Sequence, residues 1–197
     1  MKLTNIVRHA LWVVLFASFA FLDVSSVASK ASTQTWGDVV SGLQMRINLD
    51  QAESMQVKTP KFRVELRNAE ESDLTLNLGI MLDNGRKQYP TAIFLNLTDT
   101  QGKSRRLDLI GPAGVAGRLD PFVLSLRVGA TFSMPVDLDR YFAAASKEYE
   151  YKPTPGTYSL EAQYTGKGVP RDMDLLLGHY WEGTVKSNRL RFDVPKQ

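Results

Sequence analysis

The sequence predicts an all-β protein made of antiparallel sheets, and three observations support this fold class. First, apolar and polar residues alternate with a period of two through most of the chain after residue 40. Neighbouring residues of a strand point to opposite faces of a sheet, so each run gives one apolar and one polar face. Second, turn-forming residues separate the runs. Third, only one stretch has the composition of a helix.

Eight runs show the alternation, which is typical of antiparallel sheets with one buried face. They cover residues 43–49, 62–67, 74–78, 93–97, 122–128, 132–138, 158–164 and 190–194. Eight or nine short strands at this spacing predict an immunoglobulin-like β-sandwich, with a barrel as the alternative.

The connections between these runs are mostly short. Asp99-Thr-Gln-Gly102 is a hairpin signal, and Gly129-Ala130 forms another tight connection. The stretch from Asp139 to about Lys147 contains three alanines, and Asp137 or Asp139 is a suitable N-cap. We therefore expect one short helix here, crossing between sheets.

The first 31 residues have the three parts of a secretory signal peptide. A basic head with Lys2 and Arg8 precedes an apolar run at 10–22 and a tail of small residues ending at Ala31. As a helix, that run rises about 20 Å, less than the roughly 30 Å hydrocarbon core of a membrane. We expect cleavage near Ala31, no stable membrane anchor afterwards, and one domain at 32–197 in the periplasm or secreted.

Charge and cysteine content narrow the classes of partner. Loss of Lys2, Arg8, Lys30 and Asp23 with the leader lowers the formal net charge from +3 to +1. Such a balance gives no electrostatic reason to expect nucleic acid as a partner. The chain has no cysteine, so the fold does not depend on disulfides, and an exported protein of this kind fits a bacterial periplasm or exterior.

The residues that metal and nucleophilic chemistry require are scarce. His9 lies in the leader, which leaves His179 as the histidine of the mature chain. Without thiols or a second histidine, a zinc site is not predicted, and no Gly-x-Ser-x-Gly segment presents a serine. We therefore expect no metal, no cofactor and no catalysis; a hydrolase with an unrecognised carboxylate pair is a less favoured alternative.

The connection at 165–183 is the main candidate for binding, because long loops at the end of a sandwich often carry function. Arginine and aromatic side chains are enriched at binding hot spots. The candidate residues are Arg171, Asp172, Asp174, His179, Tyr180 and Trp181. In the alternative interpretation, Trp181 closes the open end of the sandwich as a core residue, which Leu175-Leu-Leu177 favours. A second long loop, at 111–121, is rich in glycine and bracketed by prolines.

The segment Pro155-Gly156-Thr157-Tyr158 resembles the tyrosine corner of immunoglobulin-like domains, in which a tyrosine hydroxyl bonds to the preceding turn. From Leu43 to Val194, the order of motifs resembles bacterial secreted sandwich domains. It is similar to the non-catalytic sandwich of peptidyl-Lys metalloendopeptidases and, more loosely, to BsuPI-type proteinase inhibitors. The zinc motif His-Glu-x-x-His is absent, so this resemblance implies a fold and no catalytic residue.

These observations predict an exported, non-catalytic β-sandwich that binds a protein or glycan partner. The alternative is a protease inhibitor that inserts a loop from one end of the sandwich.

Overall fold

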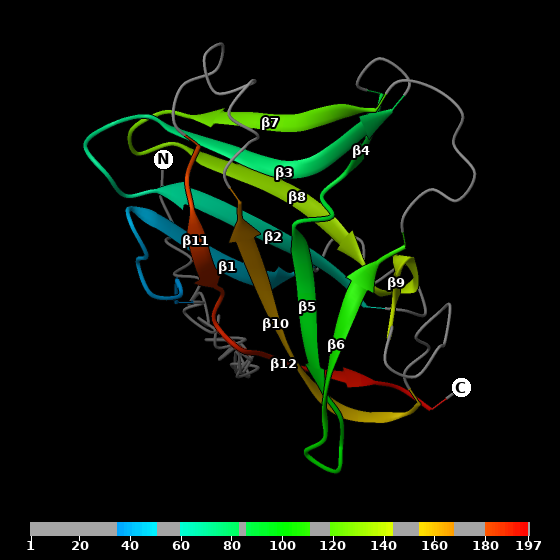
Figure 1. The fold of residues 1–197 in the computed structure, drawn as a ribbon. Coiled ribbons are helices and arrows are strands. Elements are labelled where there is room, and N and C mark those ends of the chain that lie inside the picture. Colours follow the sequence, from blue (N-terminus) through cyan, green and yellow to red (C-terminus); the bar gives the residue numbers. More distant parts are fainter. Residues whose placement is uncertain are drawn as a thin grey trace, which may run out of the picture. The chain divides into compact units, whose positions relative to one another are not determined.

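The computed structural model describes residues 35–50, 60–82, 86–110, 119–143, 154–167 and 180–196. The described residues belong to one compact unit and form an all-β protein of antiparallel sheets (Figure 1). The predicted fold class is therefore confirmed at this level. The predicted leader at 1–31 lies outside the described residues.

Twelve strands occur in the described part of the chain. They are β1 (Leu43–Leu49), β2 (Lys61–Asn68), β3 (Leu74–Leu82), β4 (Lys87–Tyr89), β5 (Ile93–Thr98), β6 (Ser104–Leu109), β7 (Asp120–Leu126), β8 (Thr131–Asp137), β9 (Tyr141–Phe142), β10 (Gly156–Gly166), β11 (Gly183–Lys186) and β12 (Leu190–Val194). All eight predicted runs overlap these strands, although the runs at 122–128 and 132–138 continue past the ends of β7 and β8.

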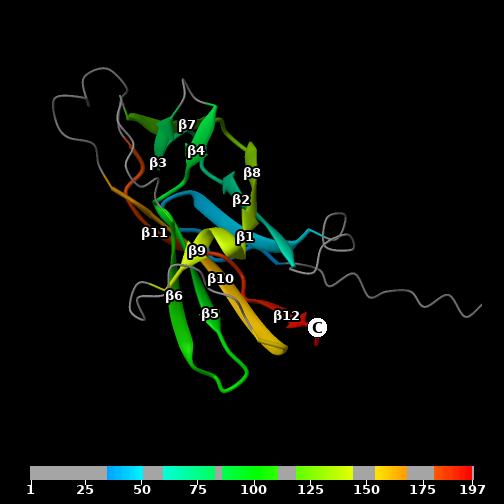
Figure 2. The same cartoon turned by 90° about the vertical axis from the view of Figure 1, so that its right-hand side faces the viewer.

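The described pairings join the strands into three sheets. Two have three strands each, in the orders β1–β2–β8 and β4–β3–β7. The third follows the path β11–β10–β5–β6–β9, and β12 also pairs with β10. β5, β6 and β10 run steeply across the direction of β1 and β2, with the two groups in separate layers (Figures 1 and 2). No pairing among the described residues closes these sheets into a barrel.

The alternating apolar side chains of the three sheets meet in one core. Along β1, for example, Leu43, Met45 and Ile47 are fully buried, whereas the residues between them are partly exposed. The other completely buried side chains of this core come from β2, β3, β5, β6, η1, β10 and β11: Phe62, Val64, Leu66, Leu76, Leu78, Ile93, Leu95, Leu107, Leu138, Leu160, Ala162, Tyr164 and Val185. Burial of this surface, at about 25 cal/mol per Å² of apolar area, is the main force that holds the sheets together.

The tyrosine-corner residues lie at the start of the long strand β10, with Pro155 directly before it. The Tyr158 hydroxyl donates a hydrogen bond of 2.9 Å to the Thr154 carbonyl, and its ring stacks on Phe192 with centroids 5.7 Å apart. Pro155 lies in the bend before the strand. Gly156 has φ +148°, where a Cβ would lie 2.4 Å from Thr100 Cγ2. The turn thus needs glycine at this position.

The helix expected from Asp139 to Lys147 is wrong over the residues that the structure describes. A single 3₁₀ turn, η1, covers Leu138–Arg140, and its N-cap Asp137 makes no side-chain capping bond. Tyr141 and Phe142 then pair with β6 as β9. Leu138 and Tyr141 are buried, and their packing together with the β6 pairing outweighs the helix propensity of the alanines, since tertiary contacts routinely override local propensity. Residues 144–147 lie outside the described residues.

Candidate functional site

Of the six candidate binding residues, the structure describes two. Arg171, Asp172, Asp174 and His179 lie outside the described residues. Tyr180 and Trp181 lie just before β11 and are 7% and 6% exposed. Both rings therefore pack inside the protein and do not form a solvent-facing aromatic surface.

Trp181 fills a slot between two sheets. Its ring stacks on Tyr164 of β10 with centroids 5.3 Å apart, and its Nε1 donates to the Ser41 carbonyl at 2.8 Å. Its backbone N–H donates to the Thr75 carbonyl of β3 at 2.8 Å. This arrangement supports the alternative interpretation of the sequence, in which Trp181 is a core residue.

Two glycines make room for the indole. A Cβ at Gly166 would lie 2.5 Å from the Trp181 carbonyl oxygen and 2.6 Å from its Cε3 atom. Gly183, with φ +146°, approaches the other end of the same ring. A methyl group at Gly166 would force the ring or the backbone to move, so the slot depends on the absence of a side chain there.

The burial of Tyr180 sets its expected contribution to stability. A solvent-facing ring in a long loop would contribute less than about 1 kcal/mol, but the observed ring is buried. We therefore expect Tyr180→Ala to lower the free energy of unfolding by about 2–4 kcal/mol. Urea unfolding measures this change, with Val128→Ala as a control because Val128 is 52% exposed. Equal unfolding midpoints for the two variants would contradict the buried position.

An open cavity of about 350 Å³ lies next to this slot, where β3, β5, β6 and β10 approach one another. Thr165 and Lys167, at the end of β10, form one wall and also begin the connection that the sequence singled out. The other lining residues are Asn77, Gly79, Thr91, Ala92, Phe94 and Arg106. A volume of this size is at the lower end of the range for small-molecule sites, about 300–1,000 Å³.

A β-bulge in β3 shapes the inner wall of the cavity. The register with β7 shifts between Asn77 and Gly79, so Leu78 is the extra residue. Leu78 packs in the core, and its carbonyl accepts a hydrogen bond of 3.0 Å from Ala92 N–H at the start of β5. Bulges often re-aim residues beside functional sites. Here the bulge brings the β3 backbone to the cavity and ties it to the sheet of β5.

Gly79 permits this close approach. Its φ is +138°, and a Cβ would lie 2.3 Å from the Tyr89 carbonyl oxygen. The Asn77 side-chain oxygen accepts a hydrogen bond of 3.1 Å from Gly79 N–H. The Asn77 carbonyl accepts a second bond of 3.1 Å from the Tyr164 hydroxyl. Burial raises the pKa of Tyr164, against the smaller opposing effect of this hydrogen bond, so the hydroxyl stays protonated and fixes the cavity wall.

Arg106 is held in place at the cavity by two contacts. Its guanidinium lies 3.7 Å above the centroid of the Phe94 ring. Its Nε and Nη2 both donate to Asp108 Oδ1, at 2.9 and 2.7 Å. Cation–π stacking and a shared carboxylate oxygen together restrict an otherwise long and mobile side chain. Sequence reasoning did not select Arg106, because the cavity also depends on three other strands.

The side chains that line the cavity are mainly cationic or neutral hydrogen-bonding groups. The described residues that line the cavity supply an arginine, a lysine, two threonines and an asparagine, and among them there is no Asp, Glu, His or Cys. In the described part of the chain, no three Asp, Glu, His or Cys side chains gather as a potential metal site.

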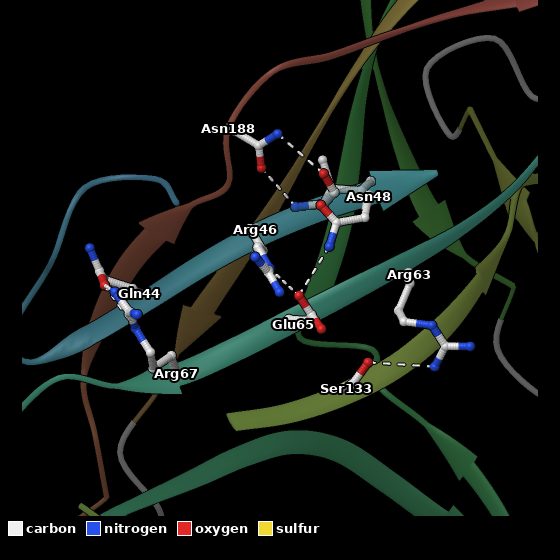
Figure 3. A network of polar contacts seen from close by, with 9 residues as sticks. Gln44, Arg46, Asn48, Arg63, Glu65, Arg67, Ser133 and Asn188 are labelled. Carbon is white, nitrogen blue, oxygen red and sulfur yellow. Dashed lines mark hydrogen bonds and ion pairs between the residues drawn. The ribbon is translucent and has the colours of Figure 1, made fainter. Parts of the chain in front are cut away.

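A second polar region covers the outer face of β1 and β2, and several of its side chains bond to one another across the two strands (Figure 3). Glu65 of β2 accepts from Arg46 and from Asn48, both on β1. Arg67 donates to Gln44 in the same way. The guanidinium groups of Arg46 and Arg67 also lie 4.5 and 4.4 Å from the centroid of the Trp36 ring. Cross-strand pairs of this kind stabilise a sheet, and we assign this face a structural role.

The outer edge of β1 is occupied along much of its length. Asn188 reaches Ile47 with both ends of its side-chain amide (Figure 3): Oδ1 accepts from Ile47 N–H at 2.8 Å, and Nδ2 donates to the Ile47 carbonyl at 3.1 Å. Met45 O accepts from Gly37 N–H, and Leu43 pairs with Val40. A side chain thus takes the place of a neighbouring strand at Ile47.

The sequence matches no model of a known protein family and no curated protein sequence. Within the residues that the structure describes, no helix is long and apolar enough to span a membrane.

Proposed function

We propose that this chain is an exported, non-catalytic binding module with an immunoglobulin-like β-sandwich fold. The observation that carries the proposal is the open cavity between β3, β5, β6 and β10, which begins at the connection that the sequence predicted to bind. Its location at the meeting point of two sheets is typical of ligand sites, which form where structural layers adjoin.

The order of the strands supports the sandwich. In immunoglobulin-like domains, one sheet holds the first, second and fifth strands, and the other holds the third, sixth and seventh. Here β1 and β2 pair with the late strand β8, whereas β10 lies between β5 and the terminal strands β11 and β12. The Tyr158 hydrogen bond to Thr154 lies at the start of β10, the position of a tyrosine corner in such a fold.

The residues of the cavity support binding rather than catalysis. General acid–base chemistry uses groups such as His, Asp or Glu within hydrogen-bond reach of the reacting atoms. The described lining offers two cations and neutral hydrogen-bonding groups instead. The resemblance to the non-catalytic sandwich of secreted proteases agrees with this assignment.

A thermal-shift screen of the purified protein against small molecules tests the binding role. A ligand at 100 times its Kd adds about 2.7 kcal/mol to the stability of the native state, which raises the Tm by several degrees. We expect Thr91→Trp, which fills the mouth of the cavity, to abolish the shift, and Thr131→Trp on the exposed side of β8 to retain it. If stabilising compounds act equally on both variants, the binding site lies elsewhere.

The alternative, a protease inhibitor that inserts a loop, has its own test. Papain-like and serine proteases are incubated with increasing amounts of the protein, and residual activity is measured. Stoichiometric inhibition that Thr91→Trp leaves unchanged would support the inhibitor role and contradict the cavity proposal.

Export is the second part of the proposal, and it predicts the N-terminus of the mature protein. The apolar run at 10–22 directs secretion and is then removed, because it is too short to remain as a membrane-spanning anchor. Mass spectrometry of the exported protein is expected to find an N-terminus between Lys30 and Thr33. Recovery of the full-length chain in the membrane fraction would contradict this prediction.

A further inference from the structure

We propose that the cavity between β3, β5, β6 and β10 recognises the anionic oxygen group, a carboxylate or a phosphate, of one small molecule. This inference rests on the binding role proposed above and specifies the ligand of that same site. It follows from two cations that lie on either side of β5, one of which contacts both Phe94 and Asp108.

Arg106 supplies a positioned set of donors. A guanidinium has five N–H groups, and Asp108 accepts from two of them, one on Nε and one on Nη2. No other described residue accepts from Arg106. The donors that are left include the edge between Nη1 and Nη2, which matches the two oxygens of a carboxylate or phosphate. Because Phe94 supports the guanidinium from below, little side-chain freedom is lost when an anion binds.

Lys167 supplies the second charge from the other side of β5. It follows directly after β10, whereas Arg106 belongs to β6, and β5 pairs with both of these strands. Lys167 makes no ion pair with a described residue. The threonines that line the cavity, Thr91 and Thr165, add neutral hydroxyl donors. An anion between the two cations thus meets donors from β6, from the end of β10 and from Thr91 before β5.

The size and the character of the lining limit the ligand to a small one. The volume of about 350 Å³ accommodates one small molecule and not an extended polymer. Phe94 is the aromatic residue of the described lining, and it is only 7% exposed beneath Arg106. Charge, rather than an open aromatic face, is therefore what the described lining offers to a ligand. Asp108, the carboxylate beside the site, is already bonded to Arg106.

Titration of the ¹⁵N-labelled full chain, followed by NMR, tests the proposal. The probes are acetate and inorganic phosphate at constant ionic strength, and acetamide serves as the neutral counterpart of acetate. Saturable shifts are expected at the amides of Asn77, Gly79, Ala92 and Lys167 with at least one anion and not with acetamide. A comparison of acetate with phosphate shows whether the site prefers a planar or a tetrahedral anion.

Charge-removing variants locate the effect. Arg106→Gln and Lys167→Gln are each expected to weaken binding of the anion at least tenfold, because each removes a charge-assisted hydrogen bond. Arg127→Gln removes the same charge from the exposed turn between β7 and β8 and is expected to leave the affinity within twofold. Thermal unfolding of each variant verifies that it is folded. Arg106→Lys retains the charge but not the planar, two-pronged set of guanidinium donors. This variant is expected to bind the anion with intermediate affinity.

Two results would overturn the inference. If anion-induced shifts persist in Arg106→Gln and Lys167→Gln, or spread evenly over the surface, no specific anion site exists. If acetamide or other neutral compounds saturate the same amides and the anions do not, the cavity binds neutral ligands; the binding role then stands and the anion assignment fails. If the thermal-shift screen also finds no compound that depends on Thr91, the proposed function fails as well.

Discussion

Replacing Tyr158 with alanine is expected to lower the free energy of unfolding by about 3–5 kcal/mol, a large share of the roughly 5–15 kcal/mol that stabilises a typical domain. The ring is 3% exposed and stacks on Phe192, which itself meets Phe62 of β2 edge-on at 4.9 Å. The substitution thus removes the first ring of an aromatic series, Tyr158–Phe192–Phe62, that connects β10 and β12 with the opposite sheet. Urea unfolding gives the change directly.

Tyr158→Phe separates the hydrogen bond from the packing. It retains the ring and removes the hydroxyl that bonds to the Thr154 carbonyl and contacts the Thr154 hydroxyl, with an expected loss of about 0.5–1.5 kcal/mol, or up to about 3 kcal/mol if the carbonyl is left without a partner. If both variants unfold at the wild-type urea concentration, Tyr158 is not the anchor that the tyrosine-corner argument requires.

Trp181→Ala is expected to cost about 3–5 kcal/mol as well. The side chain is 6% exposed, lies on Tyr164 and bonds to Ser41 O, so its removal empties the slot beside Gly166. Trp181→Phe retains part of the packing but leaves the Ser41 carbonyl without its donor, with an expected cost of about 1–3 kcal/mol.

A tryptophan in a different environment provides the matched control. Trp36 is partly exposed beneath Arg46 and Arg67, and we expect Trp36→Ala to cost no more than about 1 kcal/mol, in the range of exposed cation–π contacts. Chemical unfolding of both alanine variants tests the difference. A loss at Trp36 equal to that at Trp181 would show that the slot is not specially important for the fold.

Much of the fold was predictable because alternation is a local signal. The strands β1, β2, β5 and β10 each have at least three buried residues at alternate positions, and their sequences alone indicate which face lies inside. The strand β4 has only three residues, and β6 presents Arg105 and Arg106 in place of apolar residues. Short or charged strands are stabilised by their neighbours, which a single sequence does not reveal.

The candidate site was predictable only in part, for the same reason. Thr165 and Lys167 belong to the connection that the sequence selected, but Arg106 enters the cavity through pairing between β5 and β6. The bulge at Asn77 and Gly79 depends on the register with β7, and the slot for Trp181 depends on the missing Cβ of Gly166. These are contacts between distant parts of the chain, and residue spacing carries no information about them.

The amide of Asn188 has a consequence for self-association. An unpaired strand edge is a template on which a second chain can add, and proteins protect such edges in several ways. In β1 the backbone N–H and carbonyl of Ile47 are already engaged by Asn188, while the edge strands β7 and β8 carry Pro121 and Pro135, which lack the donor that a ladder requires. Asn188 thereby occupies the edge of β1 at Ile47, so the N–H and the carbonyl of this residue are not available to pair with a strand of a second molecule.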